Sequence, residues 1–258
     1  MIKRIDRKYE KKVVEYLNKE KEINTFSLQE LKNYGFENMF YKIYSDVDED
    51  GNINGVLFKC FEYLTFYAYG DFDVDGFCEL ISDMEFNEIS GKSACVDLIA
   101  KKLGLLKYRR VHLCRLLSMD EYEEDIDENF KLKKINLFNM KKVVKLYEEI
   151  NEFQNTTIEN LRLNLKSGRG YCIEENKKII SMAKSTAENK NTAMIIGVGT
   201  HPDYRNRGFA TKCMMKLCRE LLDKNIVPCL FYDNEEAGKI YKKLGFETID
   251  NWSIYYKE

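Results

Sequence analysis

The sequence predicts an α/β (α+β) protein with a mixed, mostly antiparallel sheet flanked by helices, in a tandem two-domain arrangement. Apolar residues recur at helical spacing in some stretches and alternate or run together in others, which indicates helices and strands in one chain. Each half shows the same order of helices, strand meander, helix and strand. A length of 258 residues also exceeds the usual size of a single core.

The composition favours a folded protein with a well-solvated surface. Hydrophobic residues make up 44% of the chain and charged residues 33%, as in typical globular proteins. A net charge of −2 gives no general attraction to nucleic acid or to an anionic membrane, so we expect neither as a partner. No run of about 18 apolar residues occurs, and residues 1–12 lack the apolar core of a secretory signal. We therefore expect a cytoplasmic protein.

The eight cysteines are scattered and form no CxxC pair. We expect them to be reduced and to pack as small hydrophobic residues, with Cys229 alone placed where a cleft could make it reactive. Because the chain has only two histidines, no zinc site is expected, and no other metal is predicted.

A nearly all-acidic stretch, DEYEEDIDE, favours an exposed connection over a packed element. We therefore expect a first domain at residues 1–119, an acidic linker at 120–128 and a second domain at 129–258.

The first half begins with helices and continues with strands. Residues 9–17 carry apolar side chains at helical spacing, and Ser27 with Glu30 fits a capping box that would open a second helix. Aromatic and β-branched residues dominate residues 39–69, so strands and hairpins are expected around the turn-rich residues 48–55. A helix over 94–103, ended by Gly104, and a strand over 108–117 complete this half.

The second half repeats this order. Residues 140–150 form one helical face, and Thr156 with Glu159 fits a capping box for the next helix. An antiparallel meander follows, with strands at 171–173, 178–184 and 193–200. The remaining elements are a long helix with its apolar face at Ala210, Cys213, Met214, Leu217 and Leu221, a buried strand at 227–232, a helix at 237–244 stopped by Gly245, and a closing strand toward Tyr255.

The strand over 193–200 runs into the loop RNRGFA, residues 205–210, and then directly into the long helix. The N–H groups at a helix start lack intrahelical acceptors and carry the positive end of the macrodipole, so they form a seat for phosphate oxygens. Gly208 lets the backbone come close, and Ala210 is small enough to leave room on the first turn. Arg205 and Arg207 add charge and donors. The loop therefore predicts a diphosphate ligand.

This loop resembles the signature R/Q-x-x-G-x-G/A of the GNAT superfamily of acyl-CoA-dependent N-acyltransferases, which Arg205, Gly208 and Ala210 meet. The resemblance extends over about half of the chain, to a lead-in of Val198, Thr200, Pro202 and Tyr204 and to the downstream Asn234, Ala237, Tyr241, Gly245 and Phe246. The first half matches by element order only, which suggests a degenerate GNAT-like domain. The resemblance thus implies a GNAT-like fold in both domains.

The resemblance also implies acetyl-CoA as co-substrate and assigns roles to the matching residues. The strands on either side of the long helix would splay apart around the thioester, with Cys229 to Tyr232 along one side of the gap. Tyr241 would be the general acid for the leaving thiolate, the alternative being a tyrosine packed on the apolar face of its helix. The residues implied in coenzyme binding are Val198, Gly199, Thr200, Arg205, Asn206, Arg207, Gly208, Phe209, Ala210, Thr211, Asn234 and Ala237.

The implied reaction moves an acetyl (acyl) group to a primary amine of a small molecule or peptide by direct attack on the thioester. His201, Glu174 and Glu175 lie near the expected site, but none is assigned as the base. Two alternatives stay open: a non-catalytic module that binds or senses acyl-CoA, and an aminoacyl-tRNA-dependent transferase. The lack of a basic surface stripe argues against the latter.

Some motifs in the first half resemble other sites but fail at a required position. Two EF-hand-like openings, at 46–51 and 71–76, have Leu57 and Ser82 where the bidentate Glu is required. The motif Gly91-Lys92-Ser93 precedes a helix but has Phe86 at the earlier glycine position of a Walker A loop, which leaves a degenerate second phosphate loop as an interpretation. Residues 44–88 carry twelve acidic residues against the single Lys59, which predicts either a solvated negative face or a surface that attracts a cationic amine and selects the acceptor.

Overall fold

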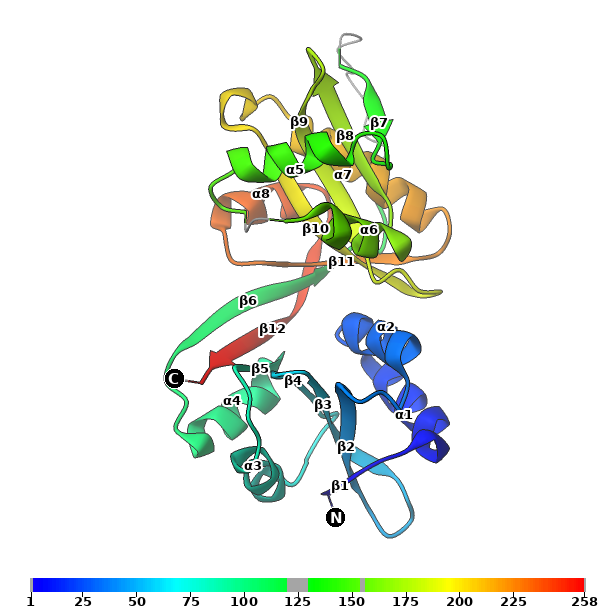
Figure 1. Cartoon of the computed structure of the whole chain (residues 1–258), viewed down its shortest axis with the longest axis vertical. Coiled ribbons are helices and arrows are strands. Elements are labelled where there is room, and N and C mark those ends of the chain that lie inside the picture. Colours follow the sequence, from blue (N-terminus) through cyan, green and yellow to red (C-terminus); the bar gives the residue numbers. More distant parts are fainter. Residues whose placement is uncertain (1, 120–129, 154–155, 258) are drawn as a thin grey trace. The chain divides into compact units, whose positions relative to one another are not determined.

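The fold is taken from a computed structural model that describes residues 2–119, 130–153 and 156–257 (Figure 1). The chain divides into two compact units, unit 1 with Met1–Leu113 and Thr248–Glu258, and unit 2 with Cys114–Glu247. The division expected from the sequence assigned the closing strand to the second domain, whereas residues 248–258 group with unit 1. The expected linker at 120–128 lies outside the described residues.

Unit 1 is built on a sheet with the strand order β1-β2-β3-β4-β5-β12-β6. Its strands are β1 (Ile2–Arg4), β2 (Tyr41–Val47), β3 (Ile53–Cys60), β4 (Tyr63–Tyr67), β5 (Glu88–Lys92), β6 (Tyr108–Arg115) and β12 (Glu247–Tyr256). Its helices are α1 (Glu10–Leu17), α2 (Thr25–Tyr34), α3 (Val74–Ser82) and α4 (Ser93–Leu103). The pairs from β1 to β4 are antiparallel, whereas β4 and β5 are parallel and are joined by α3.

Unit 2 has the strand order β11-β10-β9-β8-β7, with the last residues of β6 next to β11. Its strands are β7 (Leu132–Lys134), β8 (Gly170–Glu175), β9 (Lys178–Thr186), β10 (Thr192–Thr200) and β11 (Val227–Tyr232). Its helices are α5 (Met140–Glu149), α6 (Ile158–Lys166), α7 (Phe209–Leu222) and α8 (Glu235–Lys243). The meander β8-β9-β10 is antiparallel, as the sequence predicts, and β11 is parallel to β10.

The repeated order of elements is confirmed, because β4-α3-β5-α4 in unit 1 matches β10-α7-β11-α8 in unit 2. Three local predictions differ from the structure. Helix α3 was not predicted, yet Asp73 accepts a hydrogen bond from the N–H of Gly76 and starts a helix there. Helix α2 begins at Thr25 rather than after Ser27. The cap of α6 is Thr157, one residue beyond the predicted Thr156.

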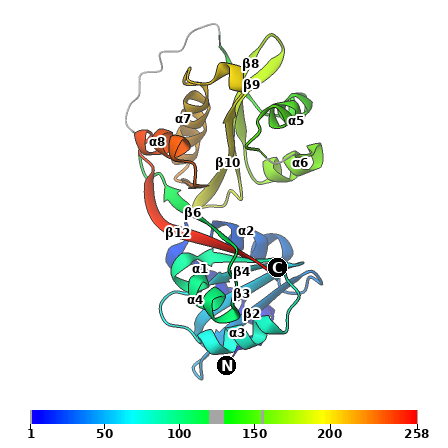
Figure 2. The ribbon, with the colours of Figure 1, turned by 90° about the vertical axis from the view of Figure 1, so that its left-hand side faces the viewer.

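The sheet of unit 2 is covered on both faces (Figure 2). Helix α7 packs through Cys213, Met214 and Leu217 on one face, in a cluster that includes Ala183 and Ile195 of the strands. Helices α5 and α6 pack on the other face, against the strand residues Cys172, Ile179 and Met182. Because successive strand residues point to opposite faces, α7 and the α5–α6 pair approach the strands from opposite sides.

Lys184 on β9 is an ionisable residue inside this core. Its side chain is on the face of Met182, and the residue is only 2% exposed. The ammonium donates a hydrogen bond to Asn164 Oδ1 (2.6 Å) and lies 5.9 Å from the ring centroid of Tyr147. Burial lowers the pKa of Lys184 to about 8.

The buried Lys184 should make stability depend on pH. Because its folded pKa lies below the ordinary value of about 10.4, the unfolded chain binds more protons between pH 8 and 10.5, and this group's contribution to stability rises with pH across that window. We expect Lys184→Met to raise the unfolding free energy at pH 7 by about 1–3 kcal/mol and to remove that rise. Urea unfolding at pH 7, 8.5 and 10 measures both effects, with the exposed Lys178→Met on the same strand as control. Parallel pH profiles for Lys184→Met and the wild type would contradict the prediction.

Candidate active site

The strands β10 and β11 pair over only part of their length. Parallel pairing covers Thr192–Ile195 against Val227–Leu230, whereas β10 continues to Thr200. A register shift against β9 falls between Ile196 and Gly199, where Gly197 has φ +60°. Such a bulge bends the strand and increases its twist. The last residues of β10 therefore diverge from β11, as expected for a strand that is to pair with an added ligand.

The loop after β10 ends in a helix start without a side-chain cap. Gly208 occupies the N-cap position of α7 with φ +75°, and this N-cap residue supplies no side-chain hydrogen bond to the first turn. A Cβ atom at Gly208 would meet nothing within 4 Å, so the space beside this residue is open. Asn206 also has a positive φ of 62°. The first N–H groups of the 14-residue helix are thus available to an anion.

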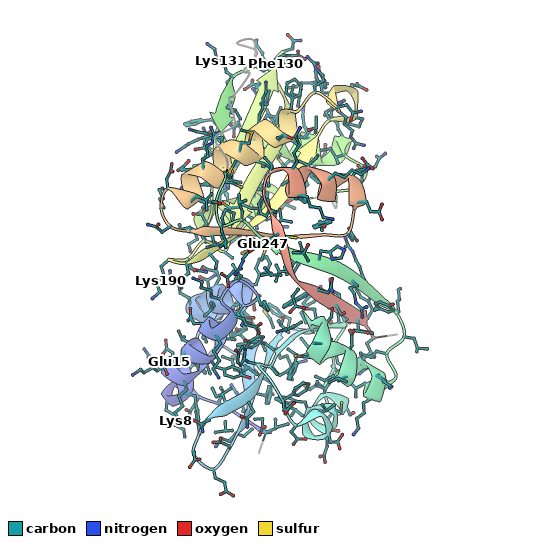
Figure 3. The ribbon with its side chains drawn as sticks, turned by 180° about the vertical axis from the view of Figure 1, so that it is seen from behind. Lys8, Glu15, Phe130, Lys131, Lys190 and Glu247 are labelled. Atoms are coloured by element: carbon teal, nitrogen blue, oxygen red, sulfur yellow. The ribbon has the colours of Figure 1, made fainter. Side chains whose placement is uncertain are left out.

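The two arginines of the loop make contacts that the sequence did not reveal. Arg205 Nη2 donates to Glu152 Oε2 (2.9 Å), and its Nε lies 3.4 Å from the carbonyl oxygen of Thr200. The guanidinium of Arg207 lies over aromatic rings, 4.8 Å from the Phe209 centroid and 5.1 Å from that of Phe130, which precedes β7 (Figure 3). Both guanidinium groups are therefore engaged with protein groups, so an anion at this helix start would be held chiefly by the main chain.

A single cavity of about 640 Å³ brings the predicted residues together. Every residue predicted to bind the coenzyme lines it, and so does Tyr241. The other lining residues are Ile150, Glu152, Phe153, Tyr204, Phe231, Tyr232, Asp233, Glu236, Lys239 and Ile240. The segment 150–153 was missed in the sequence because it reaches the cavity from the opposite face of the sheet, which no local pattern indicates.

The start of α8 is shaped by Asn234. Its Oδ1 accepts hydrogen bonds from the N–H groups of Glu236 (2.9 Å) and Ala237 (3.2 Å) and caps the helix. One turn further on, a Cβ at Gly238 would collide with the ring of Tyr232, so only glycine lets this ring pack against α8. Asn234 therefore has a structural role, and its Nδ2 is the part of the side chain left for a ligand.

Tyr241 combines burial with access to the cavity. It is 8% exposed, and its ring centroid lies 5.6 Å from that of Tyr232 and 6.0 Å from that of Phe246. Burial, with a smaller effect from Cys114, raises the pKa of Tyr241 to about 12. The phenol is therefore protonated at neutral pH and can act as a proton donor.

The residues considered as bases or nucleophiles lie outside the cavity lining. Cys229 is fully buried and only the later part of its strand, Phe231 and Tyr232, reaches the cavity. Glu174 accepts hydrogen bonds from Lys142 (2.5 Å) and Lys133 (2.9 Å), which hold its pKa below the usual value. Neither Cys229 nor Glu174 lines the cavity.

His201 is also engaged elsewhere. Its Nδ1 accepts from the N–H of Asp203 (3.2 Å), and its Nε2 lies 3.5 Å from Glu149 Oε2. Glu175 interacts with the Tyr204 hydroxyl, raising the pKa of that phenol. Neither His201 nor Glu175 lines the cavity, so neither is assigned as the base.

The matching place in unit 1 is built differently. The start of α3 is capped by the carboxylate of Asp73, and Asp75 adds a second negative charge to the first turn. The strands β4 and β5 stay paired as far as Phe66 and Gly91, where a Cβ on Gly91 would collide with the Phe66 carbonyl oxygen. This helix start repels an anion, and the strands leave no room for an added ligand arm.

The motif Gly91-Lys92-Ser93 lies at the end of β5 and the start of α4, the counterpart of the junction between β11 and α8. It is therefore not the counterpart of the RNRGFA loop. Lys92 Nζ binds the carboxylate of Glu20 (2.8 Å).

Within the described ranges, no group of three or more His, Cys, Asp or Glu side chains could hold a metal ion. Among the described helices, none is long and apolar enough to cross a membrane.

Part of the chain is similar in sequence to curated proteins that are named as acetyltransferases. The chain is 29% identical over 85 residues to histone acetyltransferase TAP1 of Glycine max, covering 33% of this chain and 37% of that protein. It is 31% identical over 75 residues to the chloroplastic GCN5-related N-acetyltransferase 2 of Arabidopsis thaliana, covering 29% of each. These matches span well under half of each relative's length.

Solved structures resemble the chain over nearly its whole length. A tandem GNAT protein from the clavulanic acid biosynthesis pathway is 12% identical, with a TM-score of 0.65, 100% of this chain and 98% of that chain covered. A GCN5-related N-acetyltransferase from Sphaerobacter thermophilus is 12% identical, with a TM-score of 0.66 and coverage of 100% and 95%. Identities this low support the fold alone.

The family model described as GNAT acetyltransferase matches residues 89–255, which include both strands of the divergent pair, the uncapped start of α7 and the whole cavity lining. This match covers more than half of the sequence, and the chain accordingly belongs to the GNAT acetyltransferase family.

Proposed function

We propose that the protein transfers an acetyl group from acetyl-CoA to a primary amine of a small molecule or peptide. The observation that carries this proposal is the meeting of divergent strands, an uncapped helix start and a buried tyrosine in one cavity. We also propose that the first domain contributes to the choice of acceptor.

Coenzyme binding would rest on the main chain. The N–H groups at the start of α7, from Gly208 to Thr211, face an open space and suit the diphosphate. The main chain of Val198 to Thr200 lies on the strand that has left β11 and suits the amides of the pantetheine arm. When bound, acetyl-CoA supplies an activated thioester, so the protein has to orient the thioester and the amine more than to activate them.

The acyl transfer itself needs two proton movements. The amine nitrogen forms a bond to the thioester carbon and releases a proton, while the carbon–sulfur bond breaks and the thiolate gains one. Tyr241, protonated at neutral pH, would supply the proton to sulfur. We assign the amine proton to water, since the carboxylates and histidine considered above are engaged elsewhere.

Gly208→Val should weaken coenzyme binding at least about tenfold, because a branched side chain disfavours the positive φ of residue 208 and occupies the space of the diphosphate. Calorimetry with acetyl-CoA measures the change. Gly104→Val is a matched control, since Gly104 also has a positive φ and open space at the end of α4. Equal affinities for Gly208→Val and the wild type, with both proteins folded, would refute the proposed seat.

Tyr241→Phe should lower kcat about a hundredfold, in the range typical of a lost general acid, and should leave the Kd for acetyl-CoA within about twofold. Thiol release with a panel of amines, measured by a chromogenic disulfide, gives kcat. An unchanged kcat would assign Tyr241 to packing alone. A wild-type protein that binds acetyl-CoA yet releases no thiol with any amine would instead favour the sensing module.

Each chain should bind one molecule of acetyl-CoA. Unit 1 has an acidic cap at the start of α3, so its matching position should not accept a diphosphate. Calorimetric titration of the full chain should give a stoichiometry of one, and Gly208→Val should weaken that single binding event. A second binding event that survives in Gly208→Val would contradict this assignment.

A further inference from the structure

Residue Glu152 is the point at which two parts of the cavity wall are joined. It lies in the segment that follows α5, and its carboxylate pairs with Arg205 of the loop before α7. The guanidinium also approaches the carbonyl oxygen of Thr200, the last residue of β10. The hydrogen bond from Arg205 holds the pKa of Glu152 below its usual value, so the pair is charged at neutral pH.

The segment that carries Glu152 rests on β10. The N–H of Phe153 donates to the carbonyl oxygen of Ile150 (3.0 Å) and closes a turn. A Cβ on Gly199 would lie 2.5 Å from Phe153 Cζ and 2.9 Å from Ile150 Cδ1, so both side chains lie against the bare backbone there. The Phe153 ring is also 4.7 Å from that of Tyr147 on α5. Ile150 and Phe153 thus form an apolar wall over the divergent strand.

This wall and the anion seat belong to opposite faces of the sheet. The seat is at the start of α7, whereas Ile150 and Phe153 approach from the face of α5 and α6 (Figure 2). A coenzyme bound along β10 and at α7 leaves the side of this wall for the second substrate. The wall is apolar and aromatic, which suits the apolar part of an arylalkyl amine.

We propose that Glu152 is a positioning residue, which through its ion pair with Arg205 holds residues 150–153 as the acceptor-side wall of the cavity. The inference rests on the proposed function, because it takes the other side of the cavity as the coenzyme site. It also gives Arg205 a role other than that of a phosphate ligand. Because an exposed ion pair contributes little to global stability, its loss should alter the local segment without unfolding the protein.

Glu152→Gln in the full chain tests this role. We expect hydrogen exchange of the Phe153 amide to accelerate about threefold and the KM for 2-phenylethylamine, as the acceptor probe, to rise by a similar factor, with kcat little changed. The Kd for coenzyme A should stay within about twofold, since the main-chain seat is intact. Adding Arg205→Gln to Glu152→Gln should accelerate exchange no further, because either variant alone breaks the pair.

Glu247→Gln is the matched control. It removes an exposed pair of the same kind, Arg115 Nε to Glu247 Oε1 (2.7 Å), at the start of β12 and outside the cavity lining (Figure 3). Wild-type exchange at Phe153 in Glu152→Gln would overturn the proposal. So would a tenfold loss of coenzyme A affinity with no change in exchange, which would assign the pair to the coenzyme. A wild-type chain that binds no coenzyme A would refute the proposed function, while the exchange measurement would still decide the role of Glu152.

Discussion

The loss of pairing between β10 and β11 after Ile195 and Leu230 is the constraint on which the site depends. A central strand normally has both edges hydrogen-bonded, and leaving an edge open has a cost unless another group pairs with it. Here the bulge near Gly197 turns β10 away while β9 continues to hold its other edge as far as Thr200. The fold therefore keeps an unpaired edge inside a cavity, where an extended ligand can complete the sheet.

The two units show that the same order of elements does not by itself make a binding site. In unit 2 the helix between the parallel strands starts at an uncapped glycine, whereas in unit 1 it starts at Asp73, whose carboxylate already accepts the N–H of Gly76. The parallel strands differ too. In unit 1, β4 and β5 stay paired as far as Phe66 and Gly91, whereas in unit 2 the pairing of β10 with β11 ends at Ile195 and Leu230. A carboxylate in one place and open space in the other distinguish the two helix starts, so the start of α7 suits an anionic ligand and that of α3 does not.

The sequence predicted best what depends on local pattern. The antiparallel meander, the strand at 227–232 and the long helix follow from apolar periodicity, and the loop from Arg205 to Ala210 follows from its residue types. Helix α3 was missed because its first turn is acidic and its cap competes with a turn in the same residues. The position of the segment 150–153 at the cavity and the grouping of residues 248–258 with unit 1 depend on tertiary contacts, which leave no periodic signal.

The arginines of the loop show why residue type and residue role can differ. A positive charge beside a phosphate seat suggests a ligand, yet Arg205 is paired with Glu152 and Arg207 lies over the rings of Phe209 and Phe130. An anion held by main-chain N–H groups needs close backbone approach more than side-chain charge. The open space at Gly208 and the small Ala210 meet that need, which leaves the arginine side chains free to shape the walls around the seat.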